Sequence, residues 1–73
     1  MAEHTLSKIF IGNRISYLRK KNNIKGKELS SILDVSTRTI SLWEEGKTIP
    51  SLQNMVNICN LFKVSLDSFV STI

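Results

Sequence analysis

The chain has 73 residues, of which 41% are hydrophobic and 22% are charged, and its formal net charge is +4. So short a chain leaves no room for a catalytic domain beside a binding domain, and we expect residues 1–73 to form a single small domain. No apolar run approaches the roughly 20 residues of a membrane span, and the first residues do not have the pattern of a signal peptide. The single cysteine, Cys59, leaves no internal disulfide, so we expect a protein of the reducing cytoplasm.

The basic residues are concentrated in one part of the chain. Residues 8–27 contain seven lysines and arginines and no acidic residue, whereas residues 28–73 contain three basic and five acidic residues. Such an uneven charge indicates a polyanionic partner, either nucleic acid or an anionic membrane surface. The alternative is a lysine-rich helix face that contacts only solvent.

Helical periodicity extends over almost the whole chain, and no stretch alternates apolar and polar residues as a strand does. The first helix is predicted over about residues 6–22. Three of its apolar residues recur at helical spacing and are expected to face the core: Ile11, Ile15 and Leu18. Gly12 costs this helix about 1 kcal/mol relative to alanine. Asn22 and Asn23 end the helix, because asparagine tolerates left-handed backbone.

Two short helices are predicted next, over residues 26–33 and about 37–45. Asp34 is expected to adopt the unusual backbone of the turn between them, and Ser36 to cap the second of the two helices. Gly46 ends that second helix, as glycine commonly does. The apolar residues expected to pack this pair of helices are Leu29, Ile32, Leu33, Val35, Ile40 and Trp43.

A fourth helix is predicted over about residues 52–62, after a cap at Ser51. Its expected buried face holds Leu52, Met55, Cys59 and Phe62, with Val56 and Ile58 at the edges. Ser65 caps a short fifth helix, whose apolar residues are Leu66, Phe69 and Val70. The predicted fold class is therefore all-α, a compact bundle of five helices joined by short loops.

The second and third predicted helices have the pattern of a helix-turn-helix over about residues 26–45. A three-residue break separates two short amphipathic helices, and the small side chain of Ser30 stands where their axes would approach. Many ordinary corners between two helices share this pattern, so the pattern by itself does not assign a function.

A longer series of residues makes the assignment more specific. Its most specific segment is Trp43-Glu44-Glu45-Gly46-Lys47 followed by Pro50. The other segments are Ile15-Ser16-Tyr17-Leu18-Arg19, Leu29-Ser30, Val35-Ser36, Ile40-Ser41-Leu42, Pro50-Ser51-Leu52 and Val64-Ser65-Leu66-Asp67. In these segments, spread over about residues 11–70, the chain resembles the helix-turn-helix family of lambda-repressor-like and Cro-like proteins, also called the xenobiotic-response-element family. The resemblance implies a five-helix domain whose third helix enters the major groove of DNA.

The outer face of the third predicted helix provides the candidate base contacts. The side chains that point away from Ile40 and Trp43, and that match the base-reading positions of the family, are Thr37, Arg38, Ser41 and Leu42. The fork of Arg38 can bind guanine O6 and N7, and Leu42 and the Thr37 methyl group can contact a thymine methyl. The alternative is that this face contacts only solvent.

The candidate phosphate contacts are Ser36, Lys47, Lys25 and Lys27. These contacts would set the register of the protein on DNA rather than read its sequence. The resemblance also implies a partly buried ion pair between Arg19 and Glu44, which ties the first helix to the third. In the family, a serine or threonine followed by a glutamine begins the second helix, whereas this chain has Lys25 and Gly26; Ser30 replaces the usual alanine and Asp34 the usual glycine.

No catalytic or metal-binding set of residues is found, so we expect no enzyme, no cofactor and no small-molecule substrate. Cys59 is expected to be a packing residue. The residues that either form a homodimer surface or close the core of one chain are Leu66, Phe69, Val70 and Ile73. The sequence thus predicts a double-stranded DNA-binding transcriptional regulator, a repressor that binds a palindromic operator as a dimer. The alternative is a protein-interaction module on the same fold, of the antitoxin or coactivator kind.

Overall fold

The computed structural model describes residues 7–70, which form five helices joined by short loops. The helices are α1 (Lys8–Lys21), α2 (Gly26–Leu33), α3 (Thr37–Glu44), α4 (Leu52–Phe62) and α5 (Leu66–Val70). Between residues 7 and 70 no segment is a strand. The predicted all-α fold of five helices is confirmed, and the four helices with predicted bounds begin and end within two residues of the prediction.

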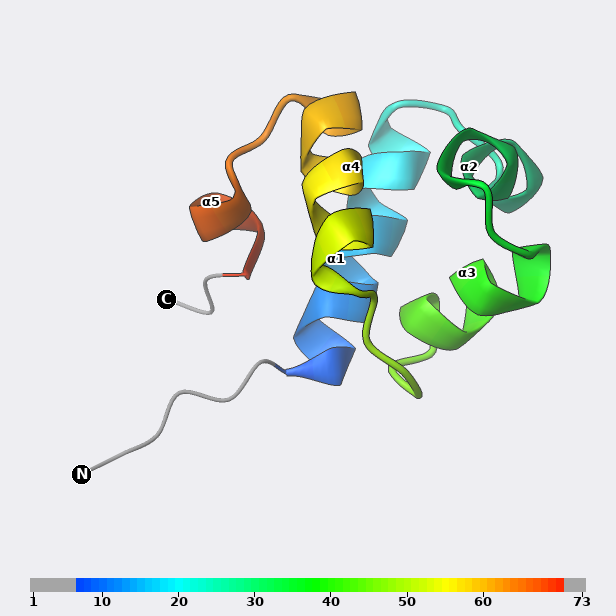
Figure 1. The fold of residues 1–73 in the computed structure, drawn as a ribbon, viewed down its shortest axis with the longest axis horizontal. Helices are drawn as coiled ribbons and strands as arrows, with labels where there is room; N and C mark the ends of the chain where they lie inside the picture. Colours follow the sequence, from blue (N-terminus) through cyan, green and yellow to red (C-terminus); the bar gives the residue numbers. More distant parts are fainter. Residues whose placement is uncertain (1–6, 71–73) are drawn as a thin grey trace.

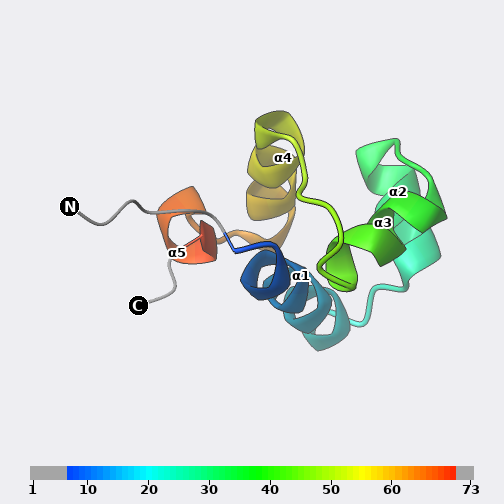
Figure 2. The same cartoon turned by 90° about the horizontal axis from the view of Figure 1, so that it is seen from below.

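The helices surround one core (Figure 1). α3 packs against α1 and α2, α2 also contacts α4, and α5 contacts α1 and α4. Seen from below, α5 lies at one end of the molecule and the α2–α3 pair at the other (Figure 2). Every helix contributes to the buried apolar residues, which are Ile11, Ile15, Leu18, Leu29, Leu33, Ile40, Trp43, Met55, Ile58, Cys59 and Phe69.

Serine side chains begin four of the five helices. The Oγ atoms of Ser7, Ser36, Ser51 and Ser65 each accept a hydrogen bond of 3.0–3.1 Å from the backbone N–H three residues later. These bonds satisfy backbone N–H groups that have no partner inside the helix, so serine is favoured just before a helix. Serines in the sequence therefore indicated most of the helix starts correctly. α2 differs, because Lys25 precedes it and an ammonium group has no acceptor.

Residues with left-handed backbone end the helices. Asn23, Asp34 and Lys63 have φ values of 56°, 57° and 58°, and Gly46 has a φ of 74°. The sequence identified the asparagine, the aspartate and the glycine, since these residue types tolerate this conformation. It did not identify Lys63, whose side chain gives no such signal.

Two predictions about the core are wrong. Ile32 is 53% exposed, because α2 turns Leu29, Ser30 and Leu33 toward its neighbours and leaves Ile32 in solvent. Leu52 is 64% exposed, because it lies in the first turn of α4, beyond the buried part of that helix. Ile58, predicted at the edge of the α4 face, is fully buried.

Candidate nucleic-acid interface

The inner side of α3 lies directly on α1. Ile40 and Trp43 are 2% and 3% exposed. A Cβ atom added at Gly12 would lie 2.1 Å from the backbone oxygen of Trp43, so only glycine allows the two helices to approach this closely. The sequence showed this glycine as a cost to α1, and the structure shows that the packing of α3 requires it.

An ion pair holds the end of α3 to α1. Arg19 Nε donates to Glu44 Oε2 at 2.6 Å, and Arg19 Nη2 donates to Glu44 Oε1 at 2.9 Å. The two side chains are only 16% and 17% exposed. The hydrogen bond to Glu44 raises the pKa of Arg19, and the same guanidinium donates to the Ile24 carbonyl oxygen at 3.1 Å. Glu44 is therefore occupied by Arg19 rather than directed at a phosphate.

The turn between α2 and α3 fixes the angle at which α3 leaves α2. Asp34 adopts left-handed backbone, its N–H donates to Ser31, and the next N–H, of Val35, donates to the Ser30 carbonyl oxygen at 2.9 Å. Ser36 Oγ then accepts from the Thr39 N–H at 3.0 Å and begins α3. The three residues of the turn therefore all have structural tasks.

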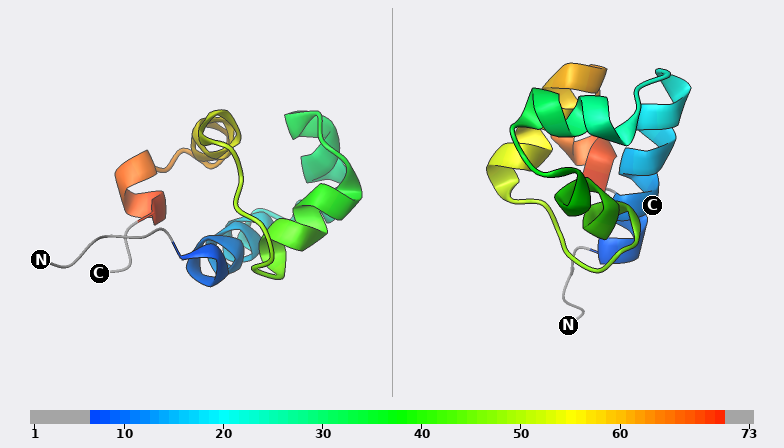
Figure 3. Two further views of the ribbon diagram at one scale, coloured as in Figure 1. Left: turned by 60° about the horizontal axis from the view of Figure 1, so that its bottom comes forward. Right: turned by 90° about the vertical axis from the view of Figure 1, so that its right-hand side faces the viewer.

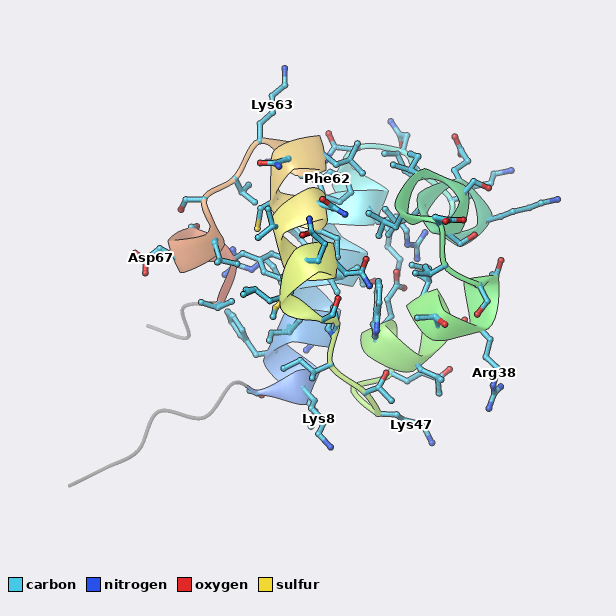
Figure 4. The ribbon with its side chains drawn as sticks, viewed as in Figure 1. Lys8, Arg38, Lys47, Phe62, Lys63 and Asp67 are labelled. Atoms are coloured by element: carbon cyan, nitrogen blue, oxygen red, sulfur yellow. The ribbon has the colours of Figure 1, made fainter. Side chains whose placement is uncertain are left out.

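The outer side of α3 is open. Thr37, Arg38 and Ser41 are exposed, and Leu42 is half-buried. Arg38 points away from the ribbon into solvent (Figure 4), and no carboxylate within residues 7–70 forms a salt bridge with it. In the side view of Figure 3, α2 and α3 are the foremost elements and no other helix covers them. The four residues predicted to read bases thus lie on the outer side of α3, which no other helix covers (Figure 3).

Lysines surround this surface. Lys25 and Lys27 are exposed at the start of α2, and Lys47 is exposed just after α3. The carboxylate of Glu28 accepts a hydrogen bond of 3.1 Å from the Lys25 backbone N–H, so one acidic group also stands at the start of α2. Ser36, the remaining predicted phosphate contact, is exposed, but its Oγ is engaged as the α3 cap.

One basic residue near this surface was not among the predicted contacts. Lys8 and Lys47 lie at the same lower edge of the molecule, to one side of Arg38 (Figure 4). The backbone supports this placement, because a Cβ atom at Gly46 would lie 3.2 Å from the Cα atom of Ile9. In the sequence, Lys8 was notable only as part of the basic segment 8–27. The fold places it beside the residues that follow α3.

The predicted dimer residues have different environments. Phe69 is fully buried within the chain, so its side chain closes the core and is not open to a second copy. Leu66 is 36% exposed and Val70 is half-buried. Ile73 lies outside the described residues. Of the four predicted dimer residues, Leu66 and Val70 are thus the described ones whose side chains are at least partly open to a partner.

The described residues contain no candidate metal cluster, no helix that could cross a membrane, and one cysteine. Within residues 7–70 no group of three histidine, cysteine, aspartate or glutamate side chains could hold a metal ion. In the same part of the chain, no helix is both long and apolar enough to cross a membrane. Cys59 is buried on α4, and its burial raises the pKa of its thiol. It therefore packs as an apolar residue.

Comparisons with known proteins agree with this geometry. Residues 15–69 match the family described as Helix-turn-helix. The HTH-type transcriptional activator BcrR of Enterococcus faecalis is 33% identical over 58 residues, which are 80% of this chain and 28% of that protein. This chain therefore spans less than a third of the length of that curated relative.

Two solved structures share the fold. A transcriptional regulator from Listeria innocua superposes with a TM-score of 0.80 at 25% identity, over 86% of this chain and 59% of that one. The P22 c2 repressor, solved in complex with a synthetic operator, superposes with a TM-score of 0.78 at 30% identity, over 86% of this chain and 96% of that one. Both are regulators by name, and the second was solved with DNA.

Proposed function

The chain belongs to the helix-turn-helix family of lambda-repressor-like and Cro-like transcriptional regulators, and we propose that it binds a specific double-stranded DNA sequence by inserting α3 into the major groove. One observation carries this proposal: the inner side of α3 is buried at Ile40 and Trp43, whereas its outer side is exposed at Thr37, Arg38 and Ser41. The major groove of DNA is about 12 Å wide and admits a helix.

Arg38 is the main base-reading residue in this proposal. Its guanidinium is exposed and free of a carboxylate partner among the described residues, so it can donate two hydrogen bonds to guanine O6 and N7. Ser41 and Leu42 follow it on the same face, and Leu42 provides an apolar contact for a thymine methyl group. Thr37 lies at the start of the helix, where it meets the groove first.

Selection from a randomised duplex library tests this function. We expect one enriched motif, and we expect Arg38→Ala to lose the guanine preference at one position of each half-site, by a factor of about 5 to 150 in affinity. The folding stability of this variant should remain within about 0.5 kcal/mol of the parent, because the side chain is exposed. If the library gives no enriched motif, the proposed function is wrong.

The lysines are proposed to bind phosphates. Lys47 and Lys8 would bind the backbone on one side of α3, whereas Lys25 and Lys27 would bind it at the start of α2, where free N–H groups also attract anions. Ser36 would add its hydroxyl to the same backbone.

Salt dependence tests the phosphate contacts. Each one contributes about 0.9 to the slope of log K against log salt concentration. Lys47→Asn should therefore weaken binding to all sequences alike and lower the slope by about 1. Lys63→Asn is the matched control, because Lys63 lies at the opposite, upper end of the molecule (Figure 4) and asparagine tolerates its left-handed backbone. An equal loss in both variants would contradict the placement of DNA at α3.

Dimerisation on a palindromic operator is part of the proposal. Half-sites in this geometry lie one helical turn, about 34–36 Å, apart, so two copies must meet beside the DNA. The exposed Leu66 and the half-buried Val70 supply apolar surface on α5 for that contact. Sedimentation of the protein with half-site and full-site duplexes should show cooperative binding only on the full site, and Leu66→Lys should remove the cooperativity.

Repression is the proposed mode of regulation. The c2 repressor, of which this chain covers 96%, carries that name, whereas BcrR, of which it covers 28%, is named an activator. A reporter with the selected operator across its promoter should fall when the protein is expressed. A rise in the reporter would assign activation instead.

One observation favours a protein-interaction module as the second candidate. The outer face of α2 has an open pocket of about 410 Å³ lined by Lys25, Lys27, Glu28, Ser31 and Ile32. The apolar side chain of Ile32 is exposed there, where a partner protein could cover it. Such a complex would resist salt, whereas DNA binding through several phosphates weakens steeply as salt rises.

A further inference from the structure

A buried hydroxyl on α2 contacts the first residue of the proposed reading helix. Ser30 is 5% exposed and is the buried polar side chain of the described core. Its Oγ lies 2.7 Å from the Lys27 carbonyl oxygen and 3.3 Å from Thr37 Oγ1. Thr37 itself is exposed, so it connects a buried group on α2 with the surface proposed to meet DNA.

The directions of these two hydrogen bonds follow from their chemistry. A carbonyl oxygen only accepts, and a serine hydroxyl has a single hydrogen. Ser30 therefore donates its hydrogen to Lys27 and can only accept from Thr37. It follows that the hydrogen between the two hydroxyls belongs to Thr37, which donates it to Ser30.

The neighbouring hydroxyls do not disturb this assignment. Ser36 and Thr39 bond to each other at 2.8 Å, and Ser36 Oγ also accepts from the Thr39 N–H. No other described side chain bonds to Thr37. The start of α3 thus has two separate hydroxyl pairs, and the pair that includes Thr37 is oriented by the α2 backbone.

From this arrangement we infer that Ser30 is a positioning residue which makes Thr37 read bases as a hydrogen-bond acceptor only. The inference rests on the proposed DNA binding. With its hydrogen directed at Ser30, Thr37 Oγ1 offers lone pairs to the groove. The donors in the major groove are the N6 amino group of adenine and the N4 amino group of cytosine, whereas guanine and thymine present acceptors at O6, N7 and O4. In the major groove each base pair has one amino-bearing base, so Thr37 selects the strand on which that base lies, that is, the orientation of an A·T or G·C pair.

The size of the selection follows from the length and burial of the bond. At 3.3 Å the Thr37 to Ser30 bond is longer than most hydroxyl pairs and therefore weak. To donate to guanine O6, however, Thr37 must release Ser30 Oγ, and Ser30 is only 5% exposed, so the loss of this donor has a cost. We expect a preference of about 2- to 10-fold for the orientation that turns the amino-bearing base toward Thr37, the range of one modest hydrogen bond.

The test uses the duplex motif that the library selection yields. Affinities are measured for all four base pairs at every position, with the parent protein, Ser30→Ala, Thr37→Val and the double variant. Thr37→Val keeps the shape of the side chain and identifies the position that Thr37 reads. At that position the parent should distinguish the two orientations of a base pair, which place the amino group on opposite strands, and Ser30→Ala should lose this preference while the guanine preference at the Arg38 position remains.

The double variant separates positioning from a general structural effect. If Ser30 acts through Thr37, then Ser30→Ala changes nothing further at that position once Thr37 is valine. An unchanged preference in Ser30→Ala, or no position sensitive to Thr37→Val, would each overturn the inference and leave DNA binding standing. Absence of any selected motif would instead overturn the proposed function.

A measurement on the parent protein alone guards against a variant that does not fold. Where the selected base is adenine, we replace it by purine, which lacks the N6 amino group; where it is cytosine, we replace it by a pyrimidinone without the N4 amino group. Affinity should fall by about 2- to 10-fold for the parent protein. No change in affinity would overturn the inference.

Discussion

α3 is held by α1 on one side and by α2 on the other, and the two contacts use different groups. On the α1 side, the backbone of Trp43 lies against Gly12, and the Arg19–Glu44 pair closes the end of the helix. On the α2 side, a three-residue turn and a weak pair of hydroxyls set the start of the helix. The first contact determines whether α3 is held at all, whereas the second determines how its first residues are presented.

The largest expected effect is that of Gly12→Ala. The added Cβ atom would lie 2.1 Å from a backbone oxygen, so α1 and α3 must separate. We expect a loss of about 3 kcal/mol or more in the free energy of unfolding, at the upper end of overpacking costs. Urea denaturation followed by circular dichroism measures it. A loss below 1 kcal/mol would show that the close approach is not required.

Glu44→Gln should have the second largest effect. It removes the charge of a bidentate pair whose members are 16% and 17% exposed, and we expect a loss of about 1–3 kcal/mol. The raised pKa of Arg19 means that the arginine contributes its part of this stability at every pH below the ordinary arginine range, and loses it only as the pH rises through the raised value. The matched control is Glu45→Gln, an exposed neighbour, which should change the stability by less than about 0.5 kcal/mol.

Ser36→Ala should cost about 1 kcal/mol. The change removes the acceptor for the Thr39 N–H and so leaves one donor at the start of α3 free. Thermal unfolding should report the loss, and Ser36→Asp, which restores an acceptor, should recover it. An unchanged stability in the alanine variant would show that the cap contributes nothing.

Gly26→Ala should have the smallest effect, and it should be stabilising. A Cβ atom there would meet only the Ile40 side chain, at 4.0 Å, so alanine fits. Alanine loses less conformational freedom than glycine when a helix forms, and we expect a gain of roughly 0.5 kcal/mol. Compared with Gly12→Ala in the same denaturation assay, it sharpens the difference between the two sides of α3. If both variants lost stability, the two sides of α3 would not differ in the way described.

The sequence predicted the local features of this fold better than its contacts. Serine caps and residues that tolerate left-handed backbone act within a few residues of themselves, so the helix bounds followed from them. Ile32 and Leu52 were misplaced because periodicity gives the direction of a side chain but not the extent of the neighbouring helix that covers it. The role of Gly12 depends on a residue that is 31 positions away in the chain, and no local pattern reports it.

The sequence predicted which residues the candidate site contains. It did not predict the hydrogen bonds and contacts that connect them. The outward face of α3 followed from helical spacing, and the pairing of Arg19 with Glu44 came from the family resemblance. The link from Ser30 to Thr37 has no signal in the sequence, because it depends on two hydroxyls meeting across a turn. Lys8 joined the surface only through the approach of α1 to the exit of α3.

The turn between α2 and α3 has a consequence for how such a protein can diversify. Asp34 ends α2 with left-handed backbone, Val35 packs against the core and Ser36 begins the next helix, so each residue of the segment has a structural role. An insertion or deletion there removes a cap or withdraws an apolar side chain, whereas the exposed segment 47–49 can change in length with less damage. Under the proposed function, descendants of this chain can therefore acquire new operators by exchanging side chains on the outside of α3, one at a time, while the length of the turn is inherited unchanged.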